Sequence, residues 1–261
     1  MSTYVMSDIH GQYKSFLKML DLIRFGEEDT LYVLGDVIDR GPDGILILEH
    51  LMKMENAQMF MGNHELLMLD ALKNEFEIQN KKRMDTDDID IWLDPCNGGL
   101  PTYNAFKALP AAKKQKILEY LKDTWVVKKV SIGKKKYYLA HAYCTKMKFD
   151  EGLRFMEIPY NETYRVVWTS IYDFRYQDMV GEKLFPNKKL TYIHGHTFTQ
   201  RLDCVDKYGR GLIYKDDNFM GYRIYNIDCG MALRNKASQL GCIRLEDERK
   251  FYVYLEDGLL E

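Results

Sequence analysis

The sequence predicts an α/β fold with parallel strands at its core. The first third of the chain alternates short apolar runs with amphipathic segments, and from Trp125 onward apolar runs of strand length dominate. The chain has 261 residues, of which 46% are hydrophobic and 29% charged, enough for one large globular domain or two small ones. A repeated strand–helix–strand order places consecutive strands side by side with right-handed crossovers.

The N-terminal third contains three predicted βα units. Each begins with a buried-strand run, and the helix after the first strand carries an apolar stripe formed by Phe16, Leu17, Leu20 and Ile23. The predicted strands are Tyr4–Met6, 30–36 and 57–63, and the predicted helices are 13–25, 43–54 and 64–73.

The middle of the chain, about 74–124, is expected to be a mostly helical insertion within a single domain spanning 1–261. Residues 74–95 are charged and irregular, and 110–123 has the pattern of an amphipathic helix. The apolar content of this segment is too small for a core of its own. Its charged part is expected to be a solvated face, with a flap over a substrate as the alternative.

The C-terminal half is expected to be rich in strands. Residues 125–133 and 134–142 have the pattern of a hairpin, and further strand runs follow at 190–197, 222–230 and 241–256. Five lysines lie in the hairpin, and we expect them to protect a solvent-facing edge rather than to bind nucleic acid.

Polar residues with metal-binding chemistry follow five of the apolar runs. They are Asp8, Asp36, Asn63, His141 and His196. His10 lies two residues after Asp8, so both side chains would point to the same face of extended backbone. Because ligands of α/β folds lie beyond the carboxyl ends of strands, these residues could converge on one site. Individually, each could instead be a helix cap, a turn former or a hydrogen-bonded core residue.

Several motifs add specificity when they are taken in order. "SDIHG", "GDVIDRG", "GNHE", "AHA", "HGHT" and "NIDCG" together resemble the metallophosphoesterase superfamily, and more narrowly the serine/threonine phosphoprotein phosphatase family. "NGGLPT" and Trp168 favour the bacterial and phage branch, which includes lambda-type protein phosphatases and diadenosine tetraphosphatases. The resemblance implies a two-sheet α/β/β/α sandwich of metallophosphoesterase type, with a dinuclear metal site between strand ends.

The resemblance also implies a role for each site residue. Asp8 and His10 would bind the first metal ion, Asp36 would bridge both ions, and Asn63, His141 and His196 would bind the second. His64 would be the general acid, oriented by Asp39, while Arg40 and Asn63 would contact the substrate.

These oxygen and imidazole ligands suit two divalent ions, with manganese expected and iron or zinc as alternatives. Two ions about 3.5–4 Å apart would activate a shared water as the nucleophile, which would attack phosphorus directly.

The sequence leaves the roles of several other residues open. We expect His194 to be structural, with metal ligation as the alternative, and Asp228 to form a structural hydrogen bond. After Trp168 the chain has Thr169 and Ser170, where the resemblance implies a phosphate-binding arginine. Arg165 or Arg175 could replace it.

The expected function is that of a hydrolase of phosphomonoesters, in particular a serine/threonine protein phosphatase. The alternative is a diadenosine tetraphosphate hydrolase, whose nucleotide would need stacking aromatics such as Tyr103, Phe106, Tyr143 or Trp168. A non-catalytic metal-binding scaffold is the alternative from another class. The presence of His64, Asp39 and Arg40 argues against it, because a scaffold needs neither an acid nor a phosphate clamp.

Charge and cysteine usage restrict partners and location. The net charge of −2 gives no reason to expect a nucleic-acid partner. Five cysteines without a CxxC pair fit reduced thiols in a cytosol. The first strand leaves no room for a signal peptide, and no apolar run reaches membrane-spanning length, so we expect a cytoplasmic protein without a membrane partner.

Overall fold

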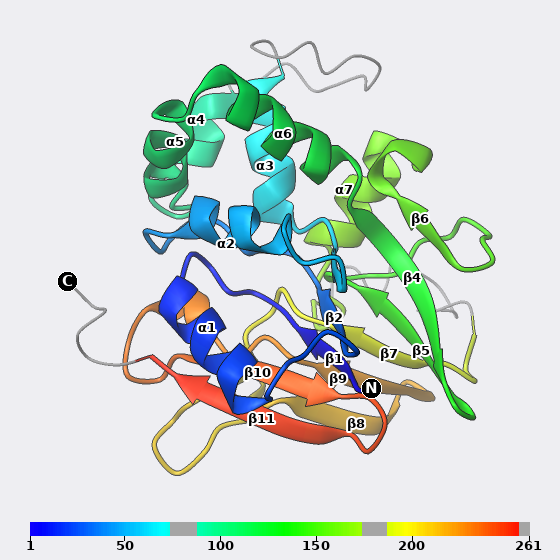
Figure 1. The fold of residues 1–261 in the computed structure, drawn as a ribbon. Coiled ribbons are helices and arrows are strands. Elements are labelled where there is room, and N and C mark those ends of the chain that lie inside the picture. The colour runs from blue at the N-terminus through cyan, green and yellow to red at the C-terminus, as the bar shows by residue number, and fades with distance from the viewer. Residues whose placement is uncertain (74–87, 174–186, 256–261) are drawn as a thin grey trace.

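Two β-sheets and the helices that flank them make up the fold (Figure 1). The computed structural model describes residues 1–73, 88–173 and 187–255. Helix α1 (Tyr13–Leu22) packs over β10 and β11 of the first sheet, and α2 to α6 gather on the opposite side of the molecule from β8 and β11 (Figure 1). The predicted α/β fold with two sheets between helices is confirmed.

The first sheet contains the three strands predicted in the N-terminal third. Within the described residues its order is β11-β10-β1-β2-β3. The strands are β1 (Thr3–Met6), β2 (Thr30–Val33), β3 (Ala57–Met59), β10 (Gln239–Arg244) and β11 (Arg249–Tyr254). β1, β2 and β3 are parallel, whereas β10 and β11 are antiparallel to their neighbours.

The strand run expected over 241–256 is in fact a hairpin of β10 and β11. Its turn contains three consecutive acidic residues, and Asp247 accepts hydrogen bonds from the side chain of Arg244 and the backbone N–H of Arg249. Glu248 adopts a left-handed φ of 59°. The charged turn therefore divides the run into two strands.

The second sheet has the order β6-β4-β5-β7-β9-β8 in the described part of the chain. Its strands are β4 (Trp125–Ile132), β5 (Lys135–Ala140), β6 (Gly152–Arg154), β7 (Thr191–His194), β8 (Tyr214–Phe219) and β9 (Tyr222–Asn226). β5, β7 and β9 are parallel. The predicted hairpin is present, because β4 and β5 pair antiparallel with Ile132 opposite Lys135.

Helices follow the strands of the first sheet and then fill the middle of the chain. After α1 come α2 (Gly44–Leu51), α3 (Asn63–Leu72), α4 (Asp88–Leu93), α5 (Leu100–Lys107), α6 (Ala111–Lys122) and α7 (Tyr160–Trp168), and short 3₁₀ helices occupy Phe155–Glu157, Thr199–Leu202 and Met231–Leu233. α4, α5 and α6 lie within the segment expected to be a helical insertion, whereas residues 74–87 lie outside the described residues.

Helix α7 was not predicted. Its buried face consists of Thr163, Val166 and Val167, which are β-branched and therefore typical of strands. In this helix the burial of one amphipathic face outweighs the local strand preference.

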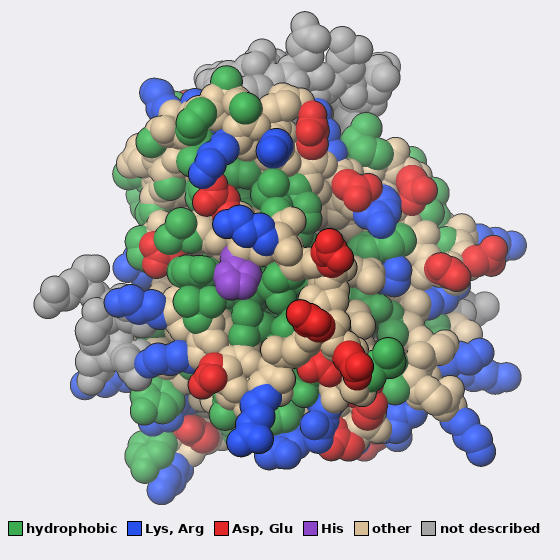
Figure 2. All heavy atoms as spheres, viewed as in Figure 1, with side chains coloured by type: hydrophobic (Ala, Val, Ile, Leu, Met, Phe, Trp, Pro, Cys, Tyr) green, Lys and Arg blue, Asp and Glu red, His purple; other side chains and the backbone are tan. Residues whose placement is uncertain are grey.

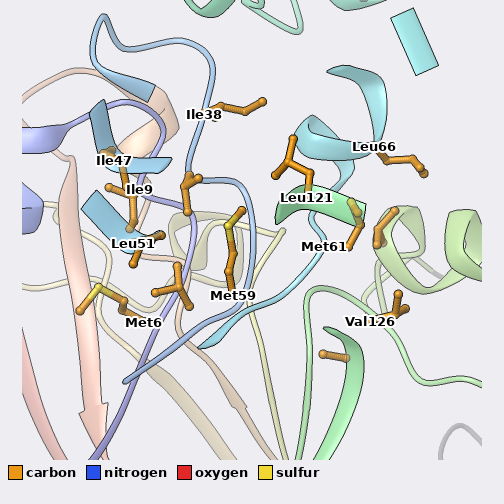
Figure 3. Packing of buried hydrophobic residues seen from close by; sticks show 14 of the residues in the cluster. Met6, Ile9, Ile38, Ile47, Leu51, Met59, Met61, Leu66, Leu121 and Val126 are labelled. Carbon is orange, nitrogen blue, oxygen red and sulfur yellow. The ribbon is translucent and has the colours of Figure 1, made fainter. Parts of the chain in front are cut away.

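Alternation along β1 divides the buried side chains between two layers. Val5 belongs to a cluster with Leu139 and Ile193 of the second sheet. Met6 points the other way, into the cluster beneath the helices, where it lies near Met59 and Leu51 (Figure 3). β1 is buried on both faces, as expected of a central strand of a sheet that lies between two layers.

The role expected of the hairpin lysines, protection of a solvent-facing edge, stays a prediction: the short β6 pairs with β4 only from Trp125 to Lys128, and Lys134, Lys135 and Lys136 are exposed. β4 lies between β5 and the short β6, and the ammonium groups of Lys128 and Lys129 lie 3.7 Å and 4.2 Å from the ring centroids of Trp125 and Phe149. Acidic and basic side chains are interspersed over the face shown in Figure 2. No helix among the described residues is long and apolar enough to cross a bilayer.

One buried carboxylate joins the loop after β2 to the start of α3. Glu65 is completely buried, and its oxygens accept hydrogen bonds from the backbone N–H groups of Asp36 at 2.8 Å, Val37 at 2.9 Å and Gly62 at 3.0 Å. A fully buried carboxylate is stabilised only when such donors replace water. Glu65 thereby fixes two of the motif-bearing loops relative to each other.

We predict that Glu65→Gln lowers the free energy of unfolding by about 1–3 kcal/mol, because the amide NH₂ would face backbone N–H donors that then lack an acceptor. Urea unfolding of both proteins measures the difference. The matched control is Glu49→Gln, which removes only the surface pair with Lys113 and should change stability by less than about 0.5 kcal/mol. Equal effects in the two variants would contradict the anchoring role of Glu65.

Candidate metal centre and catalytic residues

The side chains predicted to bind metal follow the carboxyl ends of parallel strands from both sheets. Asp8 follows β1, Asp36 follows β2 and Asn63 begins the helix after β3, while His141 follows β5 and His196 follows β7. The structure brings them together because these strands run in parallel within each sheet and the two sheets face each other.

Asp36 is common to two groups of side chains able to hold a metal ion. One group is His10, Asp36 and His64, the other is Asp36, His141 and His196, and within each group the potential ligand atoms lie within 4.8 Å of one another. The Oδ2 atom of Asp36 is 3.7 Å from Nε2 of His10 and 3.5 Å from Nε2 of His141. This is the central position that the sequence assigns to Asp36.

Asn63 and Asp8 complete the cluster. The Oδ1 atom of Asn63 is 3.0 Å from Nε2 of His141 and 2.9 Å from Nδ1 of His196. The carboxylate of Asp8 accepts the backbone N–H of His196 at 3.1 Å. Asp8 belongs to neither close group of ligand atoms, although it lies beside one of their members.

Left-handed backbone is concentrated at this site. Among the described non-glycine residues with positive φ, six are candidate site residues: Asp8 (55°), His10 (48°), Asp36 (53°), Asp39 (67°), Arg40 (65°) and His196 (68°). Such conformations cost on the order of 1 kcal/mol or more each and persist only where the surroundings enforce them. Here the loops after β1 and β2 hold each other, with Asp8 N–H bonded to Gly35 O at 3.1 Å and His10 N–H to Asp36 O at 3.0 Å.

His64 and Asp39 form the pair expected of a general acid and its orienting carboxylate. Nδ1 of His64 lies 2.8 Å from Oδ2 of Asp39, and Nε2 of His64 faces Asp36, whose Oδ2 is 3.9 Å away. Both side chains are buried. With its Nδ1–H directed at Asp39, the imidazole of His64 presents its Nε2 atom to the cluster of metal-binding side chains around Asp36.

Two residues of the helical segment, Trp92 and Thr102, support Asp39. The indole N–H of Trp92 donates to Oδ2 of Asp39 at 2.8 Å, and Oγ1 of Thr102 accepts the backbone N–H of Asp39 at 2.9 Å. Both supporting side chains are fully buried. Sequence reasoning assigned them no role, because Trp92 lies in a charged segment whose pattern carries no chemical motif.

The four other candidates are two structural residues, His194 and Asp228, and two arginines, Arg165 and Arg175, considered for phosphate binding. Nε2 of His194 is hydrogen-bonded to the hydroxyl of Tyr172 at 3.2 Å, and Oδ1 of Asp228 accepts the backbone N–H of Gly230 at 2.9 Å. Both contacts are structural ones of the kind expected. Arg165 is paired with Glu162 at 2.7 Å, so its charge is already compensated. Arg175 lies outside the described residues.

Buried carboxylates give the cluster an excess of negative charge. Burial, followed by the Asp228 and Asp36 charges, raises the pKa of Asp8 well above its usual range. Burial and the Asp36 charge likewise raise the pKa of Asp228 to about 7. Burial lowers the pKa of His141, but Asp36 and Asp8 outweigh it and raise that pKa to about 10. The cluster therefore favours bound positive charge, and its carboxylate, amide and imidazole donors fit divalent metal ions.

Comparison with known proteins agrees with this geometry. The calcineurin-like phosphoesterase family matches residues 1–218. Curated relatives include symmetrical bis(5'-nucleosyl)-tetraphosphatases of Wigglesworthia glossinidia brevipalpis, 44% identical over 71 residues, and of Erwinia tasmaniensis, 34% identical over 102 residues. The first alignment covers 26% of each chain, and the second covers 36% of this chain and 37% of its relative. The chain therefore matches only about a quarter to a third of the length of these relatives.

Solved structures share the fold. A protein provisionally described as a diadenosine tetraphosphatase aligns with a TM-score of 0.60 at 16% identity, covering 98% of this chain and 94% of the other. A serine/threonine phosphatase of Saccharomyces cerevisiae aligns with a TM-score of 0.52 at 16% identity, covering 98% and 80%. Identities this low support the architecture alone.

The family match spans far more than half of the sequence and includes the five strand ends that carry the clustered side chains. It confirms the resemblance drawn from the motifs. The chain belongs to the calcineurin-like phosphoesterase family.

Proposed function

We propose that this protein is a metal-dependent phosphoesterase whose centre holds two divalent ions. The observation that supports this proposal most directly is that Asp36 belongs to both groups of side chains able to hold a metal ion, one with His10 and His64 and the other with His141 and His196. In this proposal Asp8, His10 and Asp36 hold the first ion, and Asp36, Asn63, His141 and His196 hold the second. Manganese is the proposed metal, because carboxylate, amide and imidazole ligands without thiolate suit it.

The proposed substrate is a dinucleoside polyphosphate such as diadenosine tetraphosphate. The names of the curated relatives favour it over a phosphoprotein, which the motifs alone had favoured. The ring of Trp168 is partly exposed and lies 6.3 Å from the ring of His196, at the wall of the centre. By contrast, Phe106 and Tyr143 are buried and unable to stack on a base.

In the proposed reaction, Arg40, His64 and Asp39 each have a distinct chemical role. Two divalent ions held by these residues would supply Lewis acidity and would lower the pKa of water. Arg40 binds oxygens of the phosphoryl group through its planar guanidinium. As a water oxygen bonds to phosphorus and releases a proton to solvent, the phosphorus–oxygen bond to the leaving group breaks. His64 donates its Nε2 proton to the departing oxygen, and Asp39 holds the imidazole by its Nδ1–H.

We expect two metal ions per folded chain, and activity that is lost on chelation and restored by Mn²⁺. Asp36→Asn should lose at least one ion and most of the rate, because a neutral amide bridges two dications poorly. Elemental analysis of dialysed protein alongside activity measures both. Asp150→Asn, at an exposed position, is the control and should keep the wild-type metal content. Active protein without metal would contradict the dinuclear centre.

A substrate panel separates the candidate activities. With Mn²⁺ present, we expect diadenosine tetraphosphate to be cleaved with a kcat/KM at least tenfold above that of a phosphothreonine peptide. Chromatography of the nucleotide products and phosphate release from the peptide give the two values. A preference for the peptide would instead support a protein phosphatase, and failure to hydrolyse any phosphoester would support a metal-binding scaffold.

The role of His64 is tested with two leaving groups of similar shape. His64→Asn should reduce the rate on phenyl phosphate by about 10²–10⁴-fold, the usual contribution of a general acid. The loss on p-nitrophenyl phosphate should be much smaller, because nitrophenolate leaves without a proton. Asp39→Asn should show the same pattern to a lesser degree. Equal losses on both substrates, with unchanged metal content, would mean that the proton comes from elsewhere.

A further inference from the structure

Partly buried arginines in this protein are usually paired with a carboxylate. Six arginines of the described chain are partly buried, and four of them form an ion pair: Arg154 with Asp123, Arg165 with Glu162, Arg210 with Asp206 and Arg244 with Asp247. Arg40 and Arg234 are the two for which no ion pair with a described carboxylate is found. A guanidinium removed from water without a counter-ion is costly, so an unpaired one indicates an anion-binding position.

These two unpaired arginines lie against each other although 194 positions separate them. Nη1 of Arg234 donates to the backbone carbonyl of Arg40 at 2.9 Å. The Nε atoms of both residues are buried and have no hydrogen-bond partner in the described part of the chain. A single bond to a neutral carbonyl satisfies one N–H of Arg234 and leaves its charge uncompensated.

The pair borders the metal centre. Arg40 lies between Asp39, which is bonded to His64, and Gly41, whose N–H donates to the carbonyl of His10 at 3.1 Å. Arg234 follows the 3₁₀ helix Met231–Leu233 and, like Arg40, has a left-handed backbone, with φ of 49°.

The loop that carries Arg234 is held firmly. Gly230 N–H is bonded to the carboxylate of Asp228, and the side-chain amide of Gln200 donates to Cys229 O at 3.1 Å and Ala237 O at 2.8 Å. The backbone before and after Arg234 is therefore fixed. Less conformational entropy of this loop is lost when the Arg234 guanidinium binds an anion.

We propose that Arg234, together with Arg40, forms a subsite for a second phosphate group next to the one that reacts. The inference rests on the proposed phosphoesterase function and specifies its substrate as a compound with consecutive phosphates, such as a nucleoside polyphosphate. One phosphate needs only Arg40 and the metal centre. Neither guanidinium has a described carboxylate partner, the Arg234 guanidinium lies at the backbone of Arg40, and a chain of phosphates would compensate both charges through forked hydrogen bonds.

The test compares binding of ADP and AMP to the Mn²⁺-loaded protein by titration calorimetry. The two nucleotides differ by one phosphate, so their affinity ratio isolates the second position. Arg234→Gln should weaken ADP binding about 10- to 100-fold, as expected for hydrogen bonds to a charged group, and change AMP binding less than about twofold. Arg234→Lys should lose part of the ADP affinity, because lysine keeps the charge but not the fork.

Controls make each outcome decisive. Arg210→Gln removes an arginine that is paired with Asp206 and should leave both affinities unchanged. If Arg234→Gln does not fold, as judged by thermal unfolding, the Arg234→Lys variant carries the comparison. Equal weakening of AMP and ADP, no change in either, or a wild-type protein that binds ADP no tighter than AMP would each overturn the subsite. A wild-type protein that fails to cleave diadenosine tetraphosphate overturns the proposed substrate without altering this binding comparison.

Discussion

The carboxylate of Glu65 is the constraint on which the centre depends. It is buried in the first turn of α3 and receives backbone N–H groups from the loop after β2 and from Gly62. Those contacts place Asp36 and Asn63 relative to each other before any ligand binds. Because Asp36 belongs to both groups of side chains able to hold a metal ion, a shift of its carboxylate would change the geometry of both groups.

A second set of contacts, between the loops after β1 and β2, explains how strained backbone is tolerated. Asp8, His10 and Asp36 all have left-handed φ values, yet the loops that carry them are bonded to each other through Gly35 O and Asp36 O. Each loop supplies the acceptors that the other needs, so neither can relax alone. The buried negative charge of the cluster adds a second cost, which bound cations relieve. Stability of the loops and affinity for metal are therefore coupled.

The sequence predicted which side chains converge at the strand ends, but not the residues that support them. Asp8, Asp36, His141 and His196 could be predicted because the carboxyl ends of parallel strands meet at one edge, a rule that needs only the strand pattern. Trp92 and Arg234 could not, because their roles depend on which distant backbone they reach in the folded chain. α7 was missed since its β-branched residues favour a strand locally. The extent of the insertion and the individual ligand roles stay predictions.

The bond from Trp92 to Asp39 has a consequence for protein engineering. An indole N–H and an imidazole N–H share one carboxylate oxygen, so the helical segment after residue 87 and the loop after β2 are not independent modules. A chimaera that takes these helices from a relative would keep the loops and every ligand, yet it would leave Asp39 with one donor fewer unless the graft supplied another N–H at that point. Exchange of these helices in this scaffold is therefore limited by a buried hydrogen bond as well as by surface shape.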